Sequence, residues 1–506
     1  MSLRYNELTR DKFTLFLLAN RKILIKTALF LLLGSLTAWM TELPYGGWWF
    51  LLALTAFFHF YKKSNQPLLH AWLYQLGYFV NALWWIYISL HDVGRMHVLL
   101  SIFAVVALSS YLSIWFALSV ATARKLIHFS FLPAALASSI CLAEWLRGIV
   151  FTGFPWAGIA ESQIDGAFFG WAPILGGLAC TWIASFTAAF IALAKTSLIK
   201  KSITVLFIVS LSNGLALIPF TTPYGSGISV ELLQGNFPQP LFMSQEQAIA
   251  QQDFYLKKLS TSSAQLVVAP ETALPITDRV LNVESLQKSL GDKNQFFLSG
   301  ILGSHDNQEL SNSALGFDHK QTYRYDKHHL VPFGEFVPTG FQWFVNAFGV
   351  PLGQFKRGDL IQNPMVLHTE KPIRLGVMIC YEDVFGSEIA KRQKYDLQGH
   401  HIWVNITNLA WFGESQAAEQ QLRLARLRSL ETGIPTIRAT NTGLTGIINE
   451  RGQVTSTLAE FEQEALTGTV QPFSGKTPYV HLGNLPILGI SILTLFFCWI
   501  RSKKLV

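Results

Sequence analysis

The sequence contains few charged residues and few cysteines. Of its 506 residues, 14% are charged and only four are cysteines. It has no internal repeat and no low-complexity segment, and no basic face with interleaved aromatic residues, which argues against a nucleic-acid partner despite the net charge of +7. Half of the residues are hydrophobic and the mean hydropathy is positive. A soluble domain does not need so much apolar surface, so we expect membrane spans.

Eight apolar stretches are long enough to cross a hydrocarbon core of about 30 Å. They lie near residues 24–40, 45–61, 68–90, 98–123, 131–146, 166–195, 202–219 and 483–500. Between about 222 and 474 the hydropathy falls, and strand-like runs alternate with helical patterns. The sequence therefore predicts a seven-span bundle (1–221), a polar α/β domain (222–474), and a closing span with a short tail (475–506).

Basic residues lie in every second loop between these stretches. By the positive-inside rule we expect both termini in the cytoplasm and the polar domain on the far side of the membrane. Residues 39–42 offer no small-residue cleavage site, so the first stretch is interpreted as an uncleaved anchor. The basic residues are Arg10, Lys12, Arg21 and Lys22 before the first stretch, Lys62 and Lys63 after the second, Arg124 and Lys125 after the fourth, Lys195, Lys200 and Lys201 after the sixth, and Arg501, Lys503 and Lys504 at the end.

Cys380 is the only cysteine outside the apolar stretches. It ends the strand-like run 373–379 and is followed at once by Tyr381, Glu382 and Asp383. It has no partner for a disulfide, and it lies on the side where cytosolic reductants do not act. We therefore predict that Cys380 is a nucleophile.

Two charged residues, Glu271 and Lys327, also follow strand-like runs. Side chains just after strands meet at a common edge in a layered fold. A cysteine nucleophile needs a base, which a desolvated carboxylate can be, and a cation to hold an oxyanion. Glu271 suits the first task and Lys327 the second, while Glu335 and Glu382 are further acids that could position the amine or assist proton transfer. Spacing alone leaves another interpretation open, in which Glu271 caps a turn, Lys327 is solvated and Cys380 is a small core residue.

Two histidine pairs, His328-His329 and His400-His401, suggest a metal site. Adjacent residues of a strand point to opposite faces, so neither pair can chelate a metal by itself. We therefore predict no metal site.

The segments that carry these residues resemble a known signature. Residues 270–275 (PETALP), 325–335 (YDKHHLVPFGE) and 379–382 (ICYE) are similar to the Glu–Lys–Cys motifs of the nitrilase superfamily. Within that superfamily, the chain resembles the membrane branch, the apolipoprotein N-acyltransferases, over nearly its whole length and in its eight-span layout. Further matching segments are 153–156, 162–166, 234–236, 410–413, 425–428 and 440–443.

The resemblance implies a fold and a set of roles. The polar domain is expected to be an extracytoplasmic, nitrilase-like αββα sandwich joined to the multi-span bundle. Glu271 is implied as general base, Lys327 as oxyanion stabiliser and Cys380 as nucleophile. The supporting residues are implied to be Glu335, Tyr381, Glu382 and Asn312, with Trp411 and Phe412 lining the lipid entrance.

The resemblance also implies a reaction and a location. An acyl chain moves from a membrane phospholipid, typically phosphatidylethanolamine, to the cysteine thiol and then to the α-amino group of the diacylglyceryl-cysteine that begins an apolipoprotein. This is ping-pong catalysis through a thioester, without metal or soluble cofactor. The expected protein is a monomer of the bacterial inner membrane. The alternatives are a membrane-tethered amide or nitrile hydrolase, a paralogue with altered acceptor specificity, and a non-catalytic scaffold.

Three positions depart from the family's pattern. Leu409 stands where an acid is usual, Met243 where a tryptophan is usual, and Gln421 where a histidine is usual. None belongs to the Glu–Lys–Cys set, so acyl-enzyme formation is not threatened. The expected consequence is altered binding of the donor or the acceptor.

Overall fold

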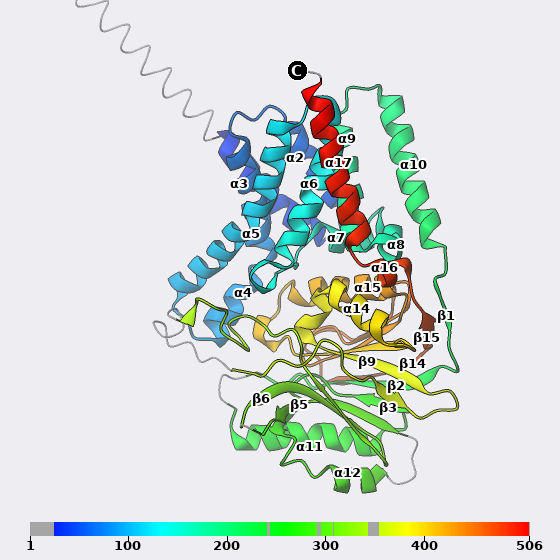
Figure 1. Cartoon of the computed structure of the whole chain (residues 1–506). Helices are drawn as coiled ribbons and strands as arrows, with labels where there is room; N and C mark the ends of the chain where they lie inside the picture. The colour runs from blue at the N-terminus through cyan, green and yellow to red at the C-terminus, as the bar shows by residue number, and fades with distance from the viewer. Residues whose placement is uncertain (1–24, 240–242, 291–294, 307, 343–353, 505–506) are drawn as a thin grey trace, which may run out of the picture.

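The computed structural model describes residues 25–239, 243–290, 295–306, 308–342 and 354–504. A bundle of long helices stands on a domain of two packed sheets (Figure 1). Of the predicted basic residues, Arg10, Lys12, Arg21 and Lys22 lie outside the described residues. The long helices are Ile25–Thr41, α2 (Gly46–Tyr61), α3 (Pro67–Ala82), α5 (Val98–Leu126), α6 (Leu132–Arg147), α9 (Gly177–Leu193), α10 (Leu198–Ala216) and α17 (Leu485–Lys503).

Four helices of the described chain are long and apolar enough to cross a membrane. These are Val98–Leu126, Phe129–Arg147, Leu198–Ala216 and Leu485–Lys503, and the helices Ile25–Thr41 and Gly177–Leu193 are apolar but shorter. Within the bundle, α3 packs on α5, α6 on α5 and α9, and α17 on α6. Helix α10 stands at the margin, where Ser212 is its only buried residue.

The sixth apolar stretch begins later than the predicted residue 166. Two short helices, η5 (Phe169–Trp171) and α8 (Ala172–Leu175), come first, and the long helix α9 begins only at Gly177. The chain turns at Gly176, whose φ of 79° is left-handed. A Cβ at Gly176 would lie 2.3 Å from the Tyr479 ring, so this break requires glycine. Hydropathy alone does not register such a turn.

The domain below the bundle consists of two sheets packed face to face. The first sheet has the order β14-β2-β3-β5-β6-β7, with β4 paired to β5, and the second has the order β13-β12-β11-β10-β9-β8. The strands of the first are β2 (Ile228–Gln234), β3 (Leu266–Val268), β4 (Leu274–Thr277), β5 (Phe296–Ser304), β6 (Leu310–Phe317), β7 (Thr322–Asp326) and β14 (Glu464–Val470). Those of the second are β8 (Met365–Leu367), β9 (Ile373–Ile379), β10 (Ile402–Thr407), β11 (Thr436–Thr440), β12 (Gly446–Ile448) and β13 (Val454–Thr457).

Apolar residues at alternate positions of both sheets form the core between them. Val230 and Leu232 of β2 face Val377 and Ile379 of β9 within one cluster of buried residues, because residues two apart on a strand share a face. Helices α11 (Gln245–Thr261) and α12 (Val283–Leu290) cover the outer face of the first sheet. Helices α14 (Gly386–Tyr395) and α15 (Ala417–Thr432) cover the second, so the predicted αββα sandwich is confirmed.

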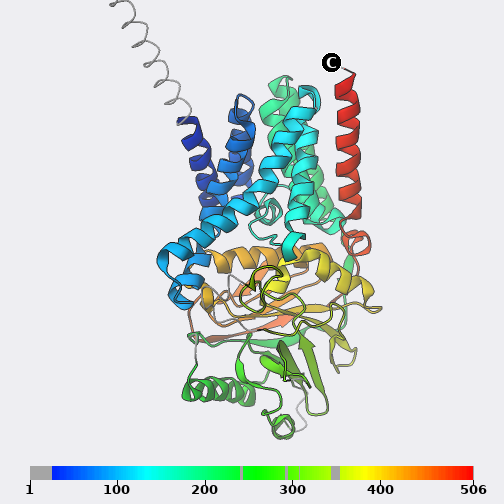
Figure 2. The same cartoon turned by 60° about the vertical axis from the view of Figure 1, so that its left-hand side comes forward.

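Helix α15 lies between the sandwich and the bundle (Figures 1 and 2). Arg423 makes two hydrogen bonds of 2.8 Å to Glu42, and Arg426 makes bonds of 2.7 and 2.9 Å to Asp165. Paired hydrogen bonds of this kind fix orientation as well as distance. The sandwich is therefore held against the bundle in one position.

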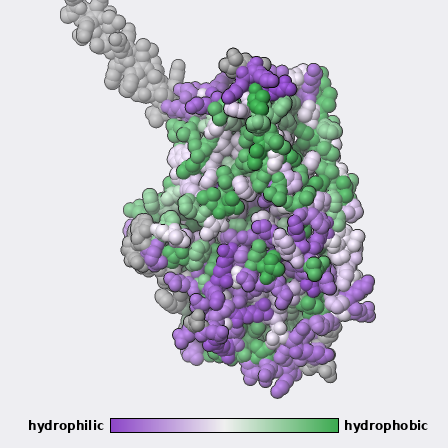
Figure 3. All heavy atoms as spheres, viewed as in Figure 1, coloured by the Kyte–Doolittle hydropathy of each residue, from purple (hydrophilic) through white to green (hydrophobic). Residues whose placement is uncertain are grey.

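Hydropathy divides the surface into bands. In Figure 3 hydrophobic residues cover the bundle, and hydrophilic residues cover the sandwich and the opposite end of the bundle. The C-terminal end of α17 lies at that opposite end, and its last turn carries Arg501 and Lys503. An apolar band between two polar zones is the pattern of a membrane protein.

Candidate active site

Glu271, Lys327 and Cys380 each follow the end of a strand. Glu271 lies three residues after β3, and Lys327 and Cys380 follow β7 and β9 directly. The backbone N–H of Lys327 donates to Asn312 O at 2.8 Å, which ties the end of β7 to β6. The three residues, of which the first and the last are more than a hundred residues apart in sequence, thus all lie just after strands of the two packed sheets.

The amine of Lys327 contacts two buried carboxylates. Its Nζ is 2.9 Å from Glu335 Oε1 and 3.3 Å from Glu271 Oε1. The amide of Asn312 donates to the same two oxygens, at 2.6 Å to Glu335 and 2.7 Å to Glu271. The remaining oxygens are also occupied, because Glu271 Oε2 accepts the N–H of Asn408 at 2.9 Å and Glu335 Oε2 that of Val331 at 2.7 Å. Both carboxylates therefore have a fixed orientation.

The charge of Lys327 is set by its neighbours. Its side chain is 1% exposed. Burial by itself lowers the pKa of Lys327, but the carboxylates of Glu335 and Glu271 outweigh this and raise the pKa above its ordinary value. Lys327 is therefore an ammonium group at neutral pH, and it can donate to a developing oxyanion.

Cys380 has a strained backbone and a protonated side chain. Its φ of 51° lies in the left-handed region, which costs a residue with a Cβ about 1–3 kcal/mol. The residue is partly exposed. Burial of the thiol and the charge of Glu271 raise the pKa of Cys380 well above its ordinary value, and Lys327 opposes this effect. The thiol therefore needs a base to become a nucleophile, and Glu271 is the acid whose charge has the largest effect on its pKa.

The sequence predicts Glu382 as an acid that could position the amine or assist proton transfer, and in the structure its oxygens bind other groups. Its Oε1 accepts the Tyr325 hydroxyl at 2.8 Å and the His328 N–H at 2.7 Å, while its Oε2 accepts the Ile379 N–H at 2.7 Å. These bonds join the turn at Cys380 to the segment that carries Lys327. Glu382 thus holds the framework, and Glu335 is the acid at the amine.

An aromatic group connects Cys380 to the bundle. The ring of Tyr381 stacks on Trp156, with centroids 6.2 Å apart. The indole N–H groups of Trp156 and Trp85 both donate to Gln420 Oε1, at 2.8 and 3.1 Å. The rings of Trp85 and Phe412 pack edge to face, with centroids 4.6 Å apart. A series of aromatic contacts therefore runs from the turn at Cys380 to the helices of the bundle. Trp411, in the same turn as Phe412, is partly exposed.

The three departures from the family's pattern lie in different surroundings. Leu409 is 3% exposed and packs with Leu422 and Leu444, where an acid would be buried among apolar side chains. Met243 is partly exposed beside the start of α11. Gln421 is fully buried, and its Nε2 donates to the carbonyl of Cys380 at 3.1 Å. Gln421 therefore contacts the backbone of Cys380, a contact that the sequence does not predict.

The histidine pairs do not converge. His329 stacks on Phe385 and its Nδ1 lies 3.1 Å from Glu388, while His328 Nδ1 contacts Gly358 O. Across the described ranges, no group of three or more His, Cys, Asp or Glu side chains is arranged to hold a metal ion.

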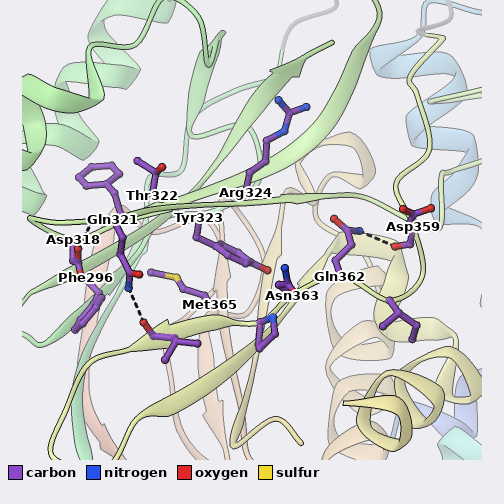
Figure 4. Close-up of a pocket in the computed structure, with 14 residues that line it drawn as sticks. Phe296, Asp318, Gln321, Thr322, Tyr323, Arg324, Asp359, Gln362, Asn363 and Met365 are labelled. Carbon is purple, nitrogen blue, oxygen red and sulfur yellow. Dashed lines mark hydrogen bonds between the residues drawn. The ribbon is translucent and has the colours of Figure 1, made fainter. Parts of the chain in front are cut away.

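A cavity of about 560 Å³ lies elsewhere, between β7 and the segment that leads into β8. Figure 4 shows Tyr323, Gln362 and Met365 among the side chains around it. Glu271, Lys327 and Cys380 do not line this cavity. It is therefore distinct from the site at Cys380.

Comparison with known proteins covers most of the chain. Residues 27–190 match the family model of the apolipoprotein N-acyltransferase N-terminal domain, and residues 233–478 match the carbon–nitrogen hydrolase model. The chain is 36% identical to the apolipoprotein N-acyltransferase of Ralstonia nicotianae, covering 90% of each protein, and 35% identical to that of Nitrosomonas europaea, covering 85% of this chain and 87% of the relative. Among solved structures, an amidase of the nitrilase superfamily from Nesterenkonia is 18% identical, with a TM-score of 0.36, over 49% of this chain and 92% of its own.

Proposed function

The chain belongs to the apolipoprotein N-acyltransferase family, and we propose that it transfers an acyl chain from a membrane phospholipid to apolipoproteins. The acceptor is the α-amino group of the N-terminal diacylglyceryl-cysteine. The observation that carries the mechanism is the buried contact of Lys327 with Glu271 and Glu335. The charge of Glu271 raises the pKa of the Cys380 thiol, and that of Lys327 lowers it. We infer that Glu271 serves as the base, Lys327 as the cation and Cys380 as the nucleophile.

The first half-reaction forms a thioester. Glu271 takes the proton of the Cys380 thiol as Sγ attacks the ester carbonyl of the phospholipid. Lys327 donates to the oxyanion of the tetrahedral intermediate. The bond between the carbonyl carbon and the glycerol oxygen then breaks, and that oxygen takes the proton from Glu271, so that the lysophospholipid leaves and the acyl chain stays on Cys380.

The second half-reaction transfers the chain to nitrogen. The neutral α-amino group attacks the thioester carbonyl, Lys327 again holds the oxyanion, and Glu271 accepts the proton that the nitrogen loses. The C–S bond breaks and the sulfur recovers that proton, which restores the enzyme. The thioester stores enough acyl-transfer potential that the reaction needs no metal and no soluble cofactor.

The lipid substrates account for the bundle. We propose eight spans, with both termini in the cytoplasm and the sandwich on the periplasmic side of the bacterial inner membrane. The basic residues at the end of the bundle remote from the sandwich support this orientation. We propose phosphatidylethanolamine as the acyl donor and a monomer as the working form. A hydrolase of soluble amides, the alternative, would have no need of the membrane bundle.

A mass measurement on the acceptor tests the proposed function. The purified protein is incubated with phosphatidylethanolamine vesicles and a synthetic diacylglyceryl-cysteine peptide. The peptide is expected to gain the mass of one fatty acyl group, in an amide that resists hydroxylamine. A peptide with an acetylated N-terminus is the matched control and should gain nothing. Free fatty acid released without any change in peptide mass would instead favour the hydrolase.

A further inference from the structure

The carbonyl of Cys380 is the focus of a buried polar cluster that the mechanism does not yet use. Asn405 Nδ2, from β10, donates to this carbonyl at 3.3 Å, and Gln421 Nε2, from α15, donates at 3.1 Å. We call Asp383, Asn405, Gln421 and Arg438 the elbow cluster. All four are 0% exposed. Two buried side chains thus donate to the backbone carbonyl of the proposed nucleophile, and we ask what this contact does for Cys380.

Asp383 and Arg438 orient the two donors. Asp383 Oδ2 accepts from Arg438 Nη1 at 2.7 Å and from Asn405 at 3.2 Å, and its Oδ1 accepts from Gln421 at 3.3 Å. Arg438 Nη2 also donates to Gln421 Oε1 at 3.1 Å. Both ends of the Gln421 amide are therefore occupied, so the amide has one orientation. The donors come from different elements of the fold and meet only in the folded domain.

The elbow cluster adds donors without adding net charge near the thiol. Burial raises the pKa of Asp383 to about 6, and the charge of Arg438 opposes this, so Asp383 is ionised at neutral pH. The charge of Asp383 also raises the pKa of Cys380. The guanidinium of Arg438, 2.7 Å away, compensates that charge. The charges of Asp383, in η6 (Cys380–Val384), and of Arg438, in β11, thus balance each other next to Cys380.

The backbone at Cys380 is held from both sides. Before it, the Ile379 N–H donates to Glu382 Oε2 at 2.7 Å; after it, the carbonyl accepts the two amides. A left-handed conformation at a residue with a Cβ persists only where its surroundings fix it. These bonds are the surroundings that fix it here.

We propose that Gln421 is a positioning residue, whose amide N–H holds the Cys380 carbonyl so that the strained turn directs the thiol toward Glu271 and Lys327. This inference rests on the proposed function. Neighbouring positions of the same helix contact the bundle, since Gln420 binds Trp85 and Arg423 binds Glu42. Helix α15 therefore links the direction of the nucleophile to the position of the sandwich on the bundle.

Two substitutions test this role. Gln421→Met keeps the length of the side chain and removes its hydrogen bonds, while Gln421→His restores a ring N–H donor. The rate of acyl-enzyme formation from phosphatidylethanolamine vesicles is expected to fall about 10- to 100-fold in Gln421→Met, because a small displacement of a reacting group has effects of this order. KM for the donor is expected to stay unchanged, and Gln421→His is expected to recover most of the rate.

A matched control separates positioning from stability. Gln393 in α14 is also a fully buried glutamine, and its amide bonds to the backbone of His400 and Gly475, away from Cys380. Gln393→Met is expected to lower the Tm about as much as Gln421→Met while leaving the rate of acyl-enzyme formation near that of the wild type.

Several outcomes would overturn the inference. One is a Gln421→Met variant that is acylated at the wild-type rate. Another is a loss of rate in Gln421→Met no larger than the loss in Gln393→Met. A third is a Gln421→His variant that has the wild-type Tm but forms the acyl-enzyme as slowly as Gln421→Met. If Gln421→Met does not fold, Gln421→Asn, which is polar but one methylene shorter, is judged against the same limits. A wild-type protein that forms no acyl-enzyme contradicts the proposed function instead.

Discussion

Replacement of Cys380 by alanine is expected to abolish transfer of the acyl chain to the acceptor peptide. The account assigns the only covalent bond between enzyme and acyl chain to this sulfur, so its removal eliminates both half-reactions. A loss of at least about 10³-fold is expected, as for other enzymes that lose their nucleophile. Transfer is measured as the mass gained by the diacylglyceryl-cysteine peptide.

The protein itself is expected to stay folded in this variant. Alanine has a Cβ like cysteine and can occupy the same backbone, and the hydrogen bonds to the Cys380 carbonyl do not involve the sulfur. Cys498→Ala is the matched control, because Cys498 is a buried thiol of α17 whose Sγ lies 3.9 Å from Phe131 O. That variant is expected to retain transfer. Full transfer by Cys380→Ala would rule out the thioester mechanism.

Replacement of Lys327 by methionine is expected to have the second largest effect. The change removes the donor to the oxyanion, which costs at least about 10²-fold in rate. It also leaves the carboxylates of Glu271 and Glu335 buried without their cation, which destabilises the protein by about 3–5 kcal/mol. Acyl transfer and the Tm in detergent measure the two effects.

The double variant Lys327→Met/Glu335→Gln separates these effects. It leaves a single carboxylate and so restores the net charge of the wild-type cluster, and it is therefore expected to recover much of the stability but none of the transfer. Lys327 also lowers the pKa of Cys380, so its loss raises that pKa further. The midpoint of the pH profile for alkylation of Cys380 is therefore expected to move to higher pH in the single variant. A midpoint that does not move would mean that the charge of Lys327 does not reach the thiol.

Glu271, Lys327 and Cys380 could be predicted because the features that single them out lie in their immediate sequence neighbourhood. Glu271, Lys327 and Cys380 each follow an apolar run, and a layered α/β fold brings such positions together. Spacing alone could not decide between a site and ordinary turn or core residues. The resemblance to known motifs favoured the site, and the contacts of Lys327 with Glu271 and Glu335 give it a geometry.

The residues that orient the site could not be predicted, because their contacts depend on the folded domain. The N–H of Asn408 binds Glu271, 137 residues away, and Gln421 binds the carbonyl of Cys380, 41 residues away. In the sequence Gln421 was only a departure from a family pattern. The sequence predicts Glu382 as a further acid that could position the amine or assist proton transfer, and it does not predict that backbone N–H groups and a phenol bind its oxygens. The chemical type of these residues was readable, and their partners were not.

The helix bounds show the same limit. Hydropathy predicts that residues 166–176 belong to the sixth span, because these residues are mostly apolar. The turn at Gly176 depends on the ring of Tyr479, which lies about three hundred residues further along the chain. Only the packed structure separates the two segments.

The most direct test of the thioester mechanism is the intact mass of the protein after incubation with phosphatidylethanolamine vesicles and no acceptor. The thioester mechanism predicts a gain of one fatty acyl group on the peptide that contains Cys380. Neutral hydroxylamine should remove this group, and it should be lost again when the diacylglyceryl-cysteine peptide is added. An unchanged mass under conditions in which the same preparation acylates the peptide would contradict it.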